Sequence, residues 1–106
     1  MTLDQLRIFA EVARQQHITK AAKAMNMTQS AVSAAVIALE ERHGVALFDR
    51  IGRSIVLNQT GTIFLEHALQ VLAEAKAAES ALRFFLSPKS AFVDAQVLRV
   101  SKAKAA

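Results

Sequence analysis

Three consecutive segments of the chain carry apolar residues at the spacing of an α-helix, with residues that can cap a helix at the breaks between them. The first segment, residues 2–15, begins with the capping-box pattern Thr2-Leu3-Asp4-Gln5. Thr19 can cap a short second helix, and Thr28 can cap a third helix that ends at Gly44. Only one Pro and three Gly occur in 106 residues, so we expect helices to dominate the fold.

The pattern changes after the third segment. Residues 45–57 predict two short strands around a turn that contains basic residues. Asn58 or Thr60 can then cap a further helix, which runs unbroken to about Leu86. Ser87-Pro88 should end that helix, because the residue before a proline leaves the helical region.

Three helices followed by a two-stranded hairpin are the plan of a winged helix-turn-helix, so we expect a mainly α fold. The predicted organisation is a winged helix-turn-helix DNA-binding domain over residues 1–58 and a linker and dimerisation helix over 59–86. Residues 87–106 should form a hinge and the start of a further domain. In this plan the third helix, about 29–43, enters the major groove, and the wing 49–54 lies on the flanking groove or backbone.

Short polar side chains stand at the beginning of the third helix. Gln29 offers both a donor and an acceptor, which suits the N6/N7 edge of adenine. Ser30 and Ser33 lie one turn apart and can reach bases or phosphates. The formal net charge of +4 has the sign that suits a polyanion. The alternative is that Thr28-Gln29-Ser30 only caps the helix, since such residues are common at helix starts.

A series of motifs follows in order along the chain: Leu3-Asp4-Gln5-Leu6 with Phe9, Ile18-Thr19-Lys20-Ala21-Ala22, Thr28-Gln29-Ser30-Ala31-Val32-Ser33, Ala38-Leu39-Glu40, Leu47-Phe48-Asp49-Arg50 and Gly61. Their succession resembles the DNA-binding domain of LysR-type transcriptional regulators, from residue 1 to about 86. The resemblance implies a bacterial transcription factor that binds DNA sequence-specifically. It also implies a C-terminal effector-binding domain, of which Val97-Leu98-Arg99-Val100 looks like the first strand, cut off.

The resemblance also implies which side chains meet DNA. These are Thr28, Gln29, Ser30 and Ser33 on the third helix, Thr19 and Lys20 at the backbone, and Arg50 and Arg53 in the wing. Family members often have Pro at position 30 and a basic or amide pair at 34–35, where this chain has Ser30, Ala34 and Ala35. Gln29, Ser33 and the wing should therefore carry more of the affinity. For the two wing arginines the alternative is a hairpin tip that stays in solvent.

Apolar residues of the long helix alternate strictly by four and three positions, the pattern of a coiled-coil seam. They are Phe64, Ala68, Val71, Ala75, Ala78, Leu82 and Phe85. This stripe either packs on its own domain or meets a second chain. Roughly 28 residues at about 1.5 Å each make a rod near 42 Å, whose later turns extend past a small domain. We therefore expect a homodimer through this helix, and a tetramer in a full-length form.

An antiparallel pairing of the two long helices would place the winged helices at opposite ends. The DNA partner should then be double-stranded and carry an interrupted inverted repeat, because major-groove faces recur every ~34–36 Å. Since the chain ends near the first effector-domain strand, we expect no small-molecule effector and constitutive DNA binding.

The sequence gives little indication of a catalytic or metal site. There is no cysteine, and Glu40-Glu41-Arg42-His43 holds a Glu-x-x-His spacing once, whereas di-iron sites need it twice. His17 and His67 lack suggestive partners, so we expect no catalysis, no metal and no cofactor. The absence of cysteine suits a reducing cytoplasm, and no uncharged apolar run reaches the roughly 18 residues of a membrane span, so we expect a cytoplasmic protein. The competing function is a helical dimerisation or adaptor module whose winged helix binds protein.

Overall fold

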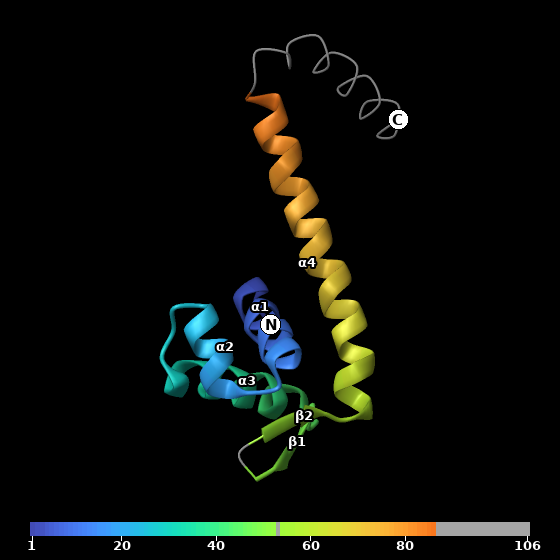
Figure 1. Cartoon of the computed structure of the whole chain (residues 1–106). Coiled ribbons are helices and arrows are strands. Elements are labelled where there is room, and N and C mark those ends of the chain that lie inside the picture. The colour runs from blue at the N-terminus through green and yellow to red at the C-terminus, as the bar shows by residue number, and fades with distance from the viewer. Residues whose placement is uncertain (53, 87–106) are drawn as a thin grey trace. The chain divides into compact units, whose positions relative to one another are not determined.

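A computed structural model describes residues 1–52 and 54–86 of the chain. Within these residues, four helices and one two-stranded antiparallel sheet follow each other (Figure 1). In chain order they are α1 (Leu3–Gln15), α2 (Ile18–Ala24), α3 (Gln29–His43), β1 (Phe48–Ile51), β2 (Ser54–Leu57) and α4 (Gln59–Phe85). This is the mainly α winged helix-turn-helix that the sequence predicted.

The capping residues explain where α1 and α3 begin and where α3 ends. Thr2 Oγ1 accepts a hydrogen bond from the Gln5 backbone N–H, and the Gln5 side chain accepts one from the Thr2 N–H, each over 3.1 Å. Thr28 Oγ1 caps α3 by accepting from the Ala31 N–H. Gly44 ends α3 in the left-handed conformation with φ 67°, which glycine adopts without steric cost. All of these caps were predicted from the sequence.

The second helix begins earlier than the sequence indicated. Its N-cap is His17 and not Thr19, because the His17 imidazole Nδ1 accepts a hydrogen bond from the Lys20 N–H over 3.2 Å. His17 has an extended backbone, with φ −161° and ψ 122°, which is the conformation that a capping residue needs. The prediction of Thr19 was wrong because histidine is not among the residues preferred at this position.

The hairpin pairs Phe48 with Leu57 and Ile51 with Ser54, with Gly52 in the turn at φ 62°. Of the two predicted caps for α4, Asn58 is the one that the structure uses, since its side-chain oxygen accepts from the Gly61 N–H. The predicted features at Arg53, Ser87-Pro88 and 97–100 lie outside the described residues.

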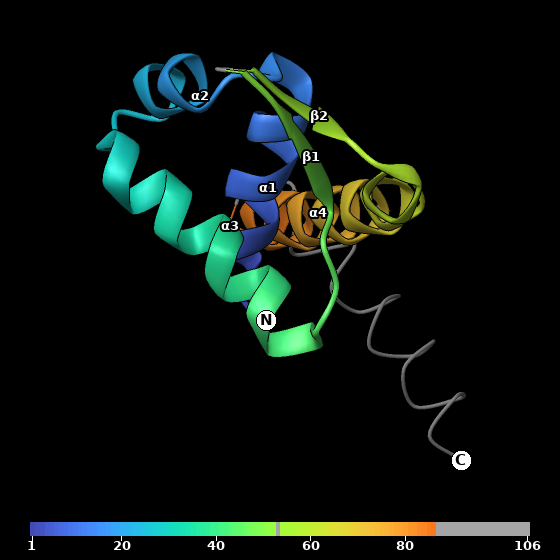
Figure 2. The same ribbon diagram turned by 90° about the horizontal axis from the view of Figure 1, so that it is seen from below.

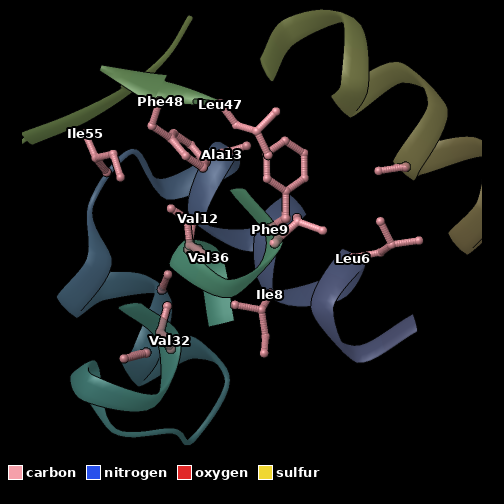
Figure 3. Packing of buried hydrophobic residues seen from close by; sticks show 14 residues of the cluster. Leu6, Ile8, Phe9, Val12, Ala13, Val32, Val36, Leu47, Phe48 and Ile55 are labelled. Atoms are coloured by element: carbon pink, nitrogen blue, oxygen red, sulfur yellow. The ribbon is translucent and has the colours of Figure 1, made fainter. Parts of the chain in front are cut away.

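The hydrophobic core is centred on the ring of Phe9, which is fully buried (Figure 3). That ring packs tilted against Phe48 of β1 and Phe64 of α4, with centroid distances of 5.5 and 5.0 Å. Further buried residues come from α1, α3, the segment before β1 and β2: Leu6, Val12, Val32, Val36, Leu39, Leu47 and Ile55. The core therefore holds α3 and the hairpin in a defined arrangement against α1.

The first half of α4 belongs to this core. Residues 1–72 form one compact unit, and the described residues that follow, 73–86, belong to a second. Phe64 packs against the core and Ala68 is only 1% exposed. Both were predicted at a seam between chains, and the structure instead uses them inside the domain, because the stripe of α4 faces α1 there.

No helix among the described residues is long and apolar enough to cross a membrane.

Candidate nucleic-acid interface

The beginning of α3 is exposed on the face of the N-terminal unit that also carries α2 and the hairpin (Figure 2). Gln29 and Ser30 are exposed, whereas Val32, Val36 and Leu39 face the core. Burial of one stripe of α3 therefore fixes its rotation and turns the polar residues of its first turn outward.

A hollow on this face joins residues from three separate segments. It is lined by His17, Ile18 and Thr19 at the start of α2, by Gln29 and Ser33 of α3, and by Arg50 and Gly52 of the hairpin. Four residues predicted to meet DNA, Thr19, Gln29, Ser33 and Arg50, thus share one surface. Because His17 caps α2, the hydroxyl of Thr19 is not used as a helix cap.

Three other predicted contact residues, Lys20, Thr28 and Ser30, are not among the residues that line the hollow. Lys20, Thr28 and Ser30 are exposed, and the Thr28 hydroxyl oxygen is engaged as the cap of α3. The cap explanation of Thr28 therefore holds, but it does not extend to Gln29, whose side chain lines the hollow. Arg53 lies outside the described residues.

His17 is the residue of this surface that the sequence reasoning missed. Its Nδ1 accepts from the Lys20 N–H, so the neutral ring carries its hydrogen on Nε2 and can donate from there. The available signal was its position directly before a short helical segment. Histidine is uncommon as a cap, so that signal was weak.

The charges of this face differ from those of α1. On α1, Arg7 pairs with Asp4 and Arg14 pairs with Glu11. Hydrogen bonds from Arg14 and Gln15 lower the pKa of the Glu11 carboxyl. Among the described residues, no ion pair involves Lys20 or Arg50, and both side chains are exposed. Their positive charges are therefore available to an anionic partner.

The described residues contain no group of three His, Asp or Glu side chains placed to hold a metal ion. The sequence singled out the Glu-x-x-His of Glu40 and His43, and the structure gives Glu40 a different role. Its carboxylate accepts a hydrogen bond from the Leu47 N–H over 2.7 Å.

Comparison with known proteins places the chain among bacterial regulators. The family model "Bacterial regulatory helix-turn-helix protein, lysR family" matches residues 3–62. The chain is similar to the HTH-type transcriptional regulator YybE of Bacillus subtilis (strain 168), with 43% identity over 93 residues, which are 88% of this chain and 32% of YybE. It is also similar to CfxR of Cupriavidus necator, with 42% identity over 78% of this chain and 26% of CfxR.

Solved structures show the same likeness. A CbnR_DBD–DNA complex matches with a TM-score of 0.76 and 32% identity, covering 82% of this chain and all of that chain. A BenM_DBD complex with catB site 1 DNA matches with a TM-score of 0.78 and 30% identity, covering 82% of this chain and 97% of that one. The chain spans about a third of the length of YybE, and a similar share of full-length CbnR, of which it covers 29%.

Proposed function

The chain belongs to the lysR family of bacterial regulatory helix-turn-helix proteins, and on this premise we propose that it binds double-stranded DNA sequence-specifically. It would do so in the cytoplasm, as the DNA-binding and dimerisation part of a bacterial transcriptional regulator. One observation carries the proposal. Thr19, Gln29, Ser33 and Arg50 come from three segments of the chain and line one hollow.

The proposed mode of binding follows from the placement of these residues. The first turn of α3 enters the major groove, where Gln29 can pair with an adenine edge and Ser33 lies one turn further along the helix. Thr19 and Lys20 contact phosphates beside the groove, and Arg50 reaches the flanking backbone or minor groove from the wing. The phosphate contacts supply affinity and orientation, while the base contacts supply sequence preference.

Gln29→Ala tests the base contact. We expect a loss of about 1–3 kcal/mol on the preferred site, together with a relaxed preference at the base pair that Gln29 reads. The preferred site is first selected from a random DNA pool, and gel shifts then measure affinity for that site and for random DNA. Gln70→Ala, an exposed glutamine on α4, serves as the matched control.

An equal loss on specific and random DNA would remove the base-reading role of Gln29. A wild-type chain that shows no preference among DNA sequences at any salt concentration would favour a protein-binding adaptor instead.

Arg50→Ala tests the wing. If Arg50 neutralises one phosphate, its replacement should reduce the slope of log affinity against log salt concentration by about one. The double variant with Arg53→Ala should reduce it by about two. Arg50→Lys keeps the charge and should keep the slope. A slope that stays unchanged in the double variant would mean that the hairpin tip remains in solvent.

The dimer is proposed to form through the later turns of α4. With Phe64 and Ala68 used in the core, the residues left for the seam are Val71, Ala75, Ala78, Leu82 and Phe85. Leu82 is 67% exposed, and an apolar side chain so exposed gains free energy when a second helix covers it. Antiparallel pairing would present two α3 helices to an interrupted inverted repeat. A full-length protein of this kind would assemble further, into a tetramer.

A further inference from the structure

Asn58 joins the start of α4 to the segment that leaves α3. Its side-chain oxygen accepts from the Gly61 N–H, and its side-chain nitrogen donates to the Ala46 carbonyl, each over 2.7 Å. Its backbone N–H donates to the Leu47 carbonyl over 3.1 Å. A helix cap needs only the first of these bonds. The other two tie α4 to a segment more than ten residues earlier in the chain.

The same segment is tied to α3. The carboxylate of Glu40, in the last turns of α3, accepts from the Leu47 N–H over 2.7 Å. Leu47 therefore bonds through its N–H to α3 and through its carbonyl to Asn58. Its side chain is buried in the core, which limits its movement. A continuous set of hydrogen bonds thus runs from α3 to the first turn of α4.

Gly61 allows the first turn of α4 to lie directly against this set. A Cβ atom at position 61 would stand 2.0 Å from the Leu47 carbonyl oxygen and 2.7 Å from the Leu57 side chain. The nearest obstacle is backbone and cannot rotate away. Any side chain at this position must therefore push α4 away from Leu47.

We propose that Asn58 and Gly61 are positioning residues that determine which half-site spacing the dimer accepts, without contacting DNA themselves. This inference rests on the proposed function. In a dimer formed through α4, each α3 is connected to the other through the paired helices and through the attachment of α4 to its own domain. That attachment consists of the core contacts of Phe64 and Ala68 and of the joint at Asn58 and Gly61. At the first turn of α4 the joint adds hydrogen bonds and a backbone contact to this packing. It therefore helps to fix the angle between α3 and α4, and that angle sets the distance between the two reading helices.

A small change in this angle is enough to alter the half-site spacing that the dimer accepts. The part of α4 up to Leu72 is about 21 Å long at 1.5 Å per residue, so a tilt of about 10° moves its end by about 3.6 Å. That displacement is close to the ~3.4 Å between successive base pairs. Loosening the joint should therefore let the dimer accept spacers one base pair longer or shorter.

The test uses Asn58→Asp and Gly61→Ala, with Gln59→Ala as a control on the neighbouring exposed residue. Aspartate keeps the oxygen that caps α4 but loses the donor to Ala46, so Asn58→Asp should keep its helix content. Gel shifts measure affinity for duplexes with one half-site and for duplexes with two inverted half-sites at varied spacers. We expect single-half-site affinity within about twofold of wild type. The preference for the best spacer over its neighbours should fall about 3–10-fold, which corresponds to the net free energy of one hydrogen bond.

The outcomes distinguish a failure of this inference from a failure of the proposed function. A folded Asn58→Asp that keeps the wild-type spacer preference overturns this inference and leaves the proposed function intact. An equal loss on one and two half-sites also overturns it, because the residues would then position α3 alone. A wild-type chain without any sequence preference overturns both. If Gly61→Ala does not fold, Asn58→Asp alone decides the result.

Discussion

Replacing Phe9 by alanine should destabilise the N-terminal unit by about 3–5 kcal/mol. Phe9 is fully buried, and its ring lies between Phe48 of the hairpin and Phe64 of α4. Its removal leaves a cavity and also breaks two aromatic contacts worth about 0.5–1.5 kcal/mol each. Small domains have only about 5–15 kcal/mol of stability, so this one change should remove a large share of it.

Urea unfolding followed by circular dichroism measures this effect. Leu3→Ala lies on the same helix at a position that is 40% exposed, and it should cost far less. Phe9→Leu should fall between the two, because it keeps most of the buried volume. A loss under about 1 kcal/mol for Phe9→Ala would contradict the packing of α1, the hairpin and α4 around this ring.

A chain with Leu82→Asp and Phe85→Asp should become monomeric. It should also lose about 10²–10⁴-fold in affinity for an operator with two half-sites, because linked binding of the second half-site is lost. Two carboxylates on an apolar seam would each need burial without a partner, which opposes pairing of the helices. Affinity for an isolated half-site should stay unchanged, since both residues belong to the second unit.

Light scattering at micromolar concentration reports the assembly, and gel shifts on the two DNA forms report the affinities. Ala77→Asp with Ser80→Asp adds the same two charges on the opposite face of α4 and should leave the dimer intact. A wild-type chain that scatters only as a monomer under these conditions would end the assembly proposal.

Much of the local structure was predictable because its causes are local. The capping box at Thr2, the cap at Thr28 and the terminating Gly44 act within a few residues, and all three are where the sequence placed them. The two short apolar runs around a turn in residues 45–57 likewise predicted the hairpin. Four residues predicted to meet DNA, Thr19, Gln29, Ser33 and Arg50, come together in one hollow, and their contact with DNA stays a prediction. His17 was missed because its capping role is rare for histidine.

The sequence by itself determined which segments become helices or strands and which face of each is apolar. It could not determine what covers those faces, because periodicity is the same for a stripe that meets its own domain and for one that meets another chain. Only the tertiary structure assigned Phe64 and Ala68 to the core. It alone also revealed the bond from Asn58 to Ala46, twelve positions away, and the contact that excludes a side chain at Gly61. Such contacts depend on distances between segments, and those distances exist only once the chain has folded.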